Sequence, residues 1–186
     1  PYTRAMLILD EGALRFDDVV VKSSNVGMAK IGKRLGNRKL FDYVKAFGFG
    51  DKTGLDLIGE DPGILLPYSR WTAFSTTSIP IGQEISVTPI QMARAFCAIA
   101  NGGQLVQPHM IRAVMTPDGR LVSDFSNPPA AGQAIPEAVA KRMRDDILCA
   151  VVERGTGTKS RLPNYRVFGK TGPAQPAQVR RGHLGD

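Results

Sequence analysis

The chain has 186 residues, a length that suits one domain or a large part of one. Its hydrophobic fraction of 42% is ordinary for a globular protein, and its net charge of +7 favours acidic partners. The basic residues are spread along the chain, and no aromatic residues accompany the one dense pair, Arg180-Arg181, so nucleic-acid binding is not predicted. Since no run of about 18 apolar residues is present, no membrane span is expected in this chain.

In chain order, the first predicted elements are helical segments over residues 5–22, followed by a turn at Ser23-Ser24-Asn25. A helix then runs to Gly36-Asn37, where glycine stops it. A second helix follows, because apolar residues recur at spacings of four and three on one face. These residues are Leu40, Val44 and Phe47.

Residues 51–87 are richer in Gly, Pro, Ser and Thr, and they predict loops with short strands. Thr88-Pro89 then supplies an N-cap followed by proline at the first helical position, which predicts a helix from Pro89 to Asn101. That helix is apolar on most of its sides, a pattern typical of a central helix.

The second half begins with a predicted strand pair over residues 104–124, turning at Pro117-Asp118-Gly119. Residues 126–134 predict a linker, and a long helix runs from Pro136 to the glycine pair at Gly155-Thr156-Gly157. A strand is expected from Tyr165 to Thr171.

Cysteine and histidine are scarce. Cys97 and Cys149 fall on apolar stripes of predicted helices, so both are expected to be buried free thiols and not a disulfide. His109 and His183 have no third ligand at metal spacing. The sequence therefore predicts no metal site and no cofactor.

Two short polar motifs lie near opposite ends of the chain, Ser23-Ser24-Asn25 and Lys170-Thr171-Gly172. Taken alone, the first can be a helix N-cap, with Ser23 or Ser24 accepting from a backbone amide. The second, taken alone, can be a strand end in a solvated turn. Their order, their wide separation and their helical and strand settings favour a shared site.

Together the two motifs resemble two of the three motifs of penicillin-binding proteins and serine β-lactamases. Other stretches resemble class B penicillin-binding proteins, and in particular the division-type peptidoglycan D,D-transpeptidases. These stretches are Val21–Met28, Phe47–Gly50, Lys52-Thr53-Gly54, Gly59-Glu60, Pro80–Ala93 and Gly155–Thr158. The resemblance spans roughly residues 15 to 175. The copy at Lys52-Thr53-Gly54 is expected to be a loop element and not the catalytic motif.

The resemblance implies an α/β (α+β) fold, the transpeptidase fold of penicillin-binding proteins and β-lactamases, present in incomplete form. Ser23-Ser24-Asn25 corresponds to the second motif of the family and Lys170-Thr171-Gly172 to the third. The chain is expected to hold the helical part and the strand of the third motif, and to lack the rest of the antiparallel sheet. Residues 1–172 are then a partial transpeptidase domain, and residues 173–186 a frayed or truncated tail.

The resemblance also assigns roles to individual residues. Ser23 joins a proton relay, and Asn25 hydrogen-bonds the bound peptide. Lys170 supplies positive charge to the relay and to the substrate carboxylate, which the Thr171 hydroxyl binds. Gly172 has no side chain, so substrate can approach the backbone there.

Two departures from the family pattern bear on activity. The chain contains no Ser-x-x-Lys, the motif that carries the nucleophile. Pro173 stands where the family has a residue whose backbone N–H is an oxyanion donor, and proline has no N–H. Losing one such donor typically costs about 10² to 10³ in rate. The chain as given is therefore expected to be inactive.

By resemblance, the parent reaction is peptidoglycan cross-linking at the extracytoplasmic face of the cytoplasmic membrane, with the anchor in a segment outside this chain. The implied partners are peptidoglycan stem peptides, β-lactams as covalent inhibitors, and membrane proteins of the division complex. Two alternatives remain open: a β-lactamase or β-lactam sensor on the same fold, and a degenerate module that only scaffolds division proteins.

Overall fold

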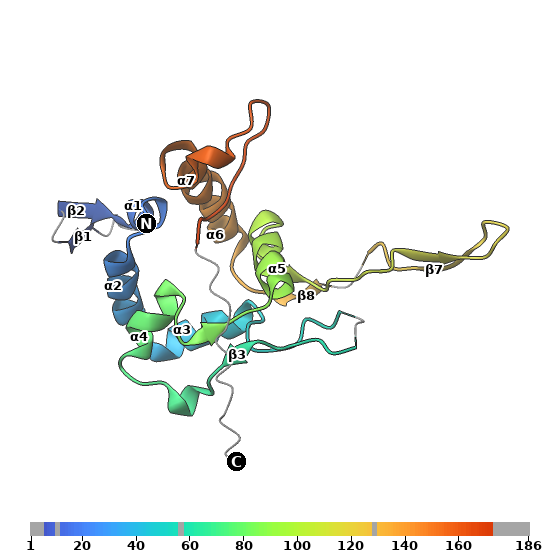
Figure 1. Ribbon diagram of the computed structural model, residues 1–186, viewed down its shortest axis with the longest axis horizontal. Coiled ribbons are helices and arrows are strands. Elements are labelled where there is room, and N and C mark those ends of the chain that lie inside the picture. Colours follow the sequence, from blue (N-terminus) through green and yellow to red (C-terminus); the bar gives the residue numbers. More distant parts are fainter. Residues whose placement is uncertain (1–5, 10–11, 56–57, 128–129, 173–186) are drawn as a thin grey trace, which may run out of the picture.

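The computed structural model describes residues 6–9, 12–55, 58–127 and 130–172. Helices gather into one body, from which a long hairpin projects (Figure 1). The helices are α1 (Phe16–Val21), α2 (Asn25–Leu35), α3 (Asn37–Ala46), α4 (Ser75–Ser78), α5 (Pro89–Ala100), α6 (Glu137–Arg142) and α7 (Cys149–Arg154). A π-helical stretch, η3 (Met143–Leu148), joins α6 to α7, and single 3-10 turns are η1 (Tyr68–Arg70), η2 (Ile79–Ile81) and η4 (Thr158–Ser160).

The strands of the described residues form antiparallel pairs and no larger sheet. The pairs are β1 (Met6–Leu9) with β2 (Gly12–Arg15), β3 (Ile64–Leu65) with β4 (Ile85–Ser86), β5 (Gln104–Val106) with β8 (Ala130–Gln133), and β6 (Ala113–Met115) with β7 (Leu121–Asp124). The β6–β7 pair is the projecting hairpin (Figure 1), and its large apolar side chains are exposed.

The short helix α1 packs against the continuous helix formed by α6, η3 and α7. Val21 is buried in one cluster with Ala150 and Val151, and Val19 is fully buried as well. Fully burying a valine side chain stabilises a fold by about 1.5–3 kcal/mol, so this contact holds the two ends of the chain together.

Two ion pairs flank the same contact. Arg142 Nη2 lies 3.3 Å from Asp17 Oδ1, and Arg154 Nη1 lies 3.0 Å from Asp18 Oδ1. Both arginine side chains are about half exposed, so each pair contributes on the order of 0–1 kcal/mol. The ion pairs therefore set the orientation of α1, while apolar burial supplies most of the energy.

The helix α2 approaches α1 and α4 closely through two of its glycines. A Cβ at Gly27 would lie 2.5 Å from a Val19 methyl, and one at Gly32 would overlap the Thr76 carbonyl. At its end, Gly36 has φ +80°, a left-handed conformation that glycine adopts without cost. The sequence predicted this stop and the following helix α3, and both are confirmed.

The helix α5 begins as predicted, at Pro89, with a capping box between Thr88 and Gln91. Its buried face is partly polar: Gln91 is 1% exposed and donates from Nε2 to the carbonyls of Asp51 and Pro62. The helix is therefore central through polar contacts as well as apolar ones.

The expectation of two buried thiols is half wrong. Both cysteines are free, but only Cys149 is buried, while Cys97 is exposed. The neighbours of α5 cover the face that carries Arg94, Ala95 and Ala98, and they leave Cys97 outside it.

Two other predictions need correction. Residues 6–9 and 12–15 form the paired strands β1 and β2 and not a helix, since a short apolar run such as Met6–Leu9 has no period that separates the two structures. Within the predicted linker 126–134, residues Ala130–Gln133 form β8, which pairs with β5. Alanine, glycine and glutamine carry no strand signal, so backbone pairing alone produces it.

The strand predicted from Tyr165 to Thr171 is not formed within the described residues. Tyr165 makes an isolated bridge to Leu162, and the Gly169 amide donates to the Leu148 carbonyl at 3.3 Å. A strand needs a ladder partner, and this segment lies along a helix instead. The long helix after Pro136 is confirmed, with the π-helical stretch in its middle.

We expect Gly155→Ala to destabilise the fold by about 1–3 kcal/mol, because the new Cβ would lie 2.5 Å from the Val21 carbonyl oxygen. Urea unfolding followed by circular dichroism measures the loss. Gly169→Ala is the matched control, since nothing lies within 4 Å of a Cβ built there. Equal midpoints for the two variants would show that α1 and the end of α7 are not in tight contact.

Candidate functional site

The two motifs from opposite ends of the chain meet in a direct hydrogen bond. Lys170 Nζ donates to Ser23 Oγ at 2.7 Å, although 147 positions separate the residues. Ser23 follows Lys22, the C-cap of α1, and Lys170 follows Gly169, whose amide is bonded to the Leu148 carbonyl in η3. Packing of α1 against η3 and α7 therefore brings the serine to the lysine.

Ser23 occupies an unusual backbone conformation, with φ +56°. This left-handed region is rare for residues other than glycine and costs on the order of 1 kcal/mol or more. Neighbouring bonds hold the turn: the Ser23 amide donates to the Val20 carbonyl, and the Ser24 amide donates to the Val19 carbonyl. The conformation points the chain from α1 into α2 while keeping the Ser23 side chain exposed.

The two serines of the first motif divide two tasks between them. Ser24 Oγ accepts from the Gly27 amide at 3.1 Å and is the N-cap of α2. Because Ser24 satisfies the helix end, the hydroxyl of Ser23 remains available to Lys170. The helix-cap interpretation of this motif is confirmed for Ser24, while Ser23 contacts the second motif through Lys170.

Lys170 is bound at two points. Its Nζ also donates to the Thr171 carbonyl, at 2.9 Å. Removal of the ammonium from water lowers the pKa of Lys170 below its ordinary value, since burial disfavours the charged form. A lowered pKa makes this ammonium a stronger proton donor than that of an ordinary lysine.

Thr171, Gly172 and Asn25 lie on the two motif segments around this bond. Thr171 Oγ1 lies 2.6 Å from Thr156 Oγ1, in the loop that follows α7. Gly172 is exposed, and nothing lies within 4 Å of where a Cβ would be. Asn25 is the exposed first residue of α2 and makes no hydrogen bond to Lys170 or Thr171 among the described residues. Pro173 lies outside the described residues.

Sequence reasoning missed the contact made by Thr156. The stretch Gly155–Thr158 stood out only as a resemblance, with no role for its threonine. The hydroxyl pair of Thr156 and Thr171 connects the loop after α7 with an irregular segment. Such a contact has no sequence period or fixed spacing that could reveal it.

The first Lys-Thr-Gly copy, at residues 52–54, is a loop element, as predicted. Thr53 is buried, and both its amide and its hydroxyl donate to Glu60 Oε1, at 2.6 Å and 2.5 Å. The Gly54 amide donates to Glu60 Oε2 at 3.2 Å. These bonds, with that of the Thr53 hydroxyl the largest influence, lower the pKa of Glu60.

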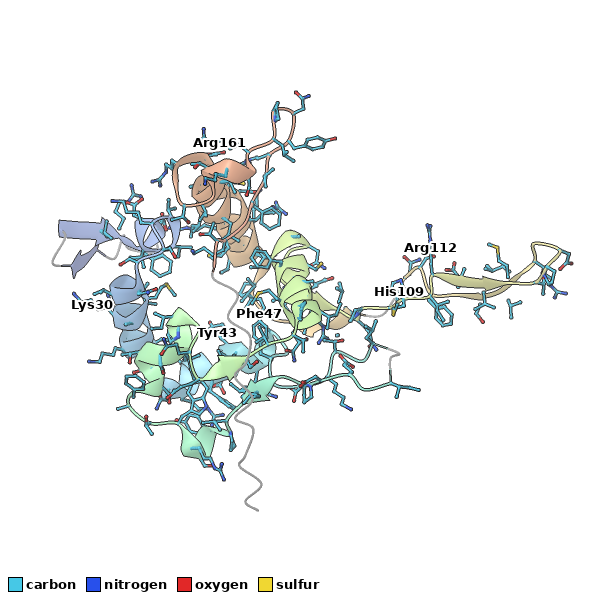
Figure 2. All side chains as sticks on the ribbon, viewed as in Figure 1. Lys30, Tyr43, Phe47, His109, Arg112 and Arg161 are labelled. Carbon is cyan, nitrogen blue, oxygen red and sulfur yellow. The ribbon has the colours of Figure 1, made fainter. Side chains whose placement is uncertain are left out.

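Other polar residues lie apart from the Ser23–Lys170 contact. His109 and Arg112 are on the projecting hairpin arm (Figure 2). In the part of the chain that the structure describes, no three His, Cys, Asp or Glu side chains gather in a way that could hold a metal ion. Within the same residues, no helix is both long enough and apolar enough to cross a membrane.

Known proteins are similar to this chain in sequence and in fold. The family model "Penicillin binding protein transpeptidase domain" matches residues 5–185. Stage V sporulation protein D of Bacillus subtilis is 42% identical over 164 residues, covering 88% of this chain and 25% of that protein. PbpB, a penicillin-binding protein of Mycobacterium tuberculosis, is 37% identical over 161 residues, covering 83% of this chain and 23% of that protein.

A solved structure is similar along most of the chain. The crystal structure of penicillin binding protein 3 from Mycobacterium tuberculosis, complexed with aztreonam, superposes with a TM-score of 0.81 at 34% identity. The match covers 92% of this chain and 40% of that one. The chain therefore belongs to the penicillin-binding protein transpeptidase family, with its transpeptidase fold present in part. It spans about a quarter of the length of the curated relatives it matches.

We expect the pKa of Lys170 to lie below the ordinary lysine value of about 10.4. Between the lowered pKa and that value the folded state binds fewer protons than the unfolded state, so this residue makes the fold more stable as pH rises through that window. Nuclear magnetic resonance titration of selectively labelled lysine measures it. An ordinary or raised pKa for Lys170 would show that its ammonium stays fully hydrated and is no stronger a proton donor than that of an ordinary lysine.

Proposed function

We propose that this chain forms the second- and third-motif side of a peptidoglycan D,D-transpeptidase site. The observation that carries the proposal is the 2.7 Å hydrogen bond from Lys170 to Ser23, which joins two motifs that no local structure would bring together. Family membership supports the reaction class, and this contact supports the choice of residues.

In the proposed reaction, a nucleophilic serine attacks the carbonyl of a D-Ala–D-Ala peptide bond, and an acyl-enzyme forms. These 186 residues contain no Ser-x-x-Lys, so the nucleophile belongs to a segment outside them. Ser23 can accept a proton and donate another at the same time, since a hydroxyl is both donor and acceptor. Ser23 therefore passes a proton to the departing amine nitrogen as the peptide C–N bond breaks, and it takes a proton in turn from the Lys170 ammonium, which donates to it.

The substrate carboxylate is assigned to the third motif. Lys170 provides positive charge, and the Thr171 hydroxyl provides a donor. Asn25, exposed at the start of α2, binds the peptide backbone through its amide. The open space beside Gly172 allows the peptide to lie against the main chain.

A β-lactam presents a carbonyl and a carboxylate in the same relation, and the proposed site accepts it as a covalent inhibitor. The related penicillin binding protein 3 of Mycobacterium tuberculosis has been solved in complex with ampicillin and with aztreonam. We further propose that the parent protein acts at the extracytoplasmic face of the cytoplasmic membrane, anchored outside this chain, together with membrane proteins of division.

One sequence feature favours a second function, a degenerate module that binds partners without catalysis. Pro173 has no N–H at the position expected to donate to the oxyanion, and the described chain has no nucleophile of its own. The two functions differ in whether the motifs support acylation once a nucleophile is supplied.

A chimera tests this directly. Residues 5–185, the range of the family match, replace the corresponding segment of Bacillus subtilis Stage V sporulation protein D, which supplies the rest of the domain. The second-order rate of acylation by a fluorescent penicillin is then measured. We expect Lys170→Ala and Ser23→Ala each to lower this rate by about 10² or more, because each removes a group of the proton relay.

Lys159→Ala is the matched control, because Lys159 is an exposed lysine in η4 and belongs to neither motif. It should leave the acylation rate unchanged. Folded chimeras whose rates do not respond to Lys170→Ala or Ser23→Ala would contradict the transpeptidase proposal and favour the scaffold. The 186-residue chain alone should show no penicillin adduct by intact mass.

The same chimera tests Pro173. We expect Pro173→Thr to raise the acylation rate by about 10² or more, since it restores a backbone N–H where oxyanion charge develops. Equal rates before and after the substitution would place the oxyanion donor elsewhere.

A further inference from the structure

Thr171 is held at both its backbone and its side chain. Lys170 Nζ donates to its carbonyl at 2.9 Å, and its hydroxyl lies 2.6 Å from the hydroxyl of Thr156. The second contact is short for two neutral hydroxyls, and it fixes the one rotatable bond of the Thr171 side chain. Neither contact belongs to a helix or a strand.

The loop that carries Thr156 is itself fixed. The amides of Gly155 and Gly157, on either side of it, both donate to the Val151 carbonyl, at 3.2 Å and 2.9 Å. Gly157 is buried, and Gly155 contacts the backbone of Val21. Thr156 is thus presented from the end of α7 by a loop with two anchoring bonds.

The direction of the hydrogen bond follows from what Thr171 must do. A carboxylate offers only acceptors, so Thr171 must give its own hydrogen to bind one. Its oxygen can then accept a hydrogen from Thr156. A hydroxyl that accepts one bond becomes a stronger donor in the next, so Thr156 strengthens the bond to the carboxylate as well as orienting it.

We propose that Thr156 is a positioning residue that aims the Thr171 hydroxyl at the carboxylate of the peptide substrate. The inference rests on the proposed function, since it assumes that the third motif binds that carboxylate. It assigns specificity for a free carboxyl terminus to a pair of threonines, one of which lies outside the motifs.

The test uses the 186-residue chain and two probes, N-acetyl-D-Ala-D-Ala and the same dipeptide with a C-terminal amide. Amide chemical shifts of the isotope-labelled chain give the dissociation constant of each probe. We expect Thr156→Val to weaken binding of the free acid by about three- to tenfold, the effect of losing one hydrogen bond, and to leave the amide probe unaffected. Thr156→Ser should bind the free acid as the original chain does.

Thr158→Val is the matched control, because Thr158 is an exposed threonine two positions along the same loop. A loss that is equal for both probes, or that Thr156→Ser does not rescue, would show a structural role and overturn the inference. Thr171→Val separates this from the proposed function. If Thr171→Val weakens binding of the free acid and Thr156→Val does not, the positioning inference alone fails. If the free acid does not bind, or binds equally well to Thr171→Val, the proposed function fails.

Discussion

The structure depends on the packing of α1 against the helix formed by α6, η3 and α7. Buried Val21, with Ala150 and Val151, joins two segments that lie more than a hundred positions apart in the chain. Close approach is possible because Gly155 has no side chain where it meets the Val21 carbonyl. The ion pairs of Asp17 and Asp18 add direction to this contact and little energy. Without this packing, Ser23 and Lys170 would not be held within hydrogen-bond distance of each other.

Near that contact, the candidate site consists of the turn at Ser23 and the side chain of Lys170, which reaches it. The positive φ of Ser23 costs free energy, and the capping bond of Ser24 helps to offset it. Lys170 loses water and has a lowered pKa, which also costs free energy in its charged form. Unfavourable local states of this kind persist where a rigid scaffold enforces them. Here the scaffold is the α1 contact, so fold stability and the proposed proton transfer depend on the same interface.

The sequence predicted helices wherever glycine, proline or a capping residue marks an end, as at Gly36 and Thr88. It failed where pairing between distant segments decides the outcome. Ala130–Gln133 becomes a strand through β5, and the segment after Tyr165 has no ladder partner and lies along a helix. The motifs pointed to Ser23 and Lys170, because polar triplets are visible in a sequence. The contact of Thr156 with Thr171 was not, because a single hydroxyl pair between a loop and an irregular segment has no pattern.

The two Lys-Thr-Gly copies show why the same residues serve different purposes. At the first copy, the amide and the hydroxyl of Thr53 both donate hydrogen bonds to the Glu60 carboxylate. The donors of this turn are therefore already used within the chain. At the second copy, the Thr171 hydroxyl contacts another hydroxyl, which can both accept and donate. A hydroxyl partner can reverse its hydrogen bond when a carboxylate arrives, whereas a carboxylate partner cannot. The neighbour of the threonine, and not the motif, therefore decides whether the turn stays closed or can receive a ligand.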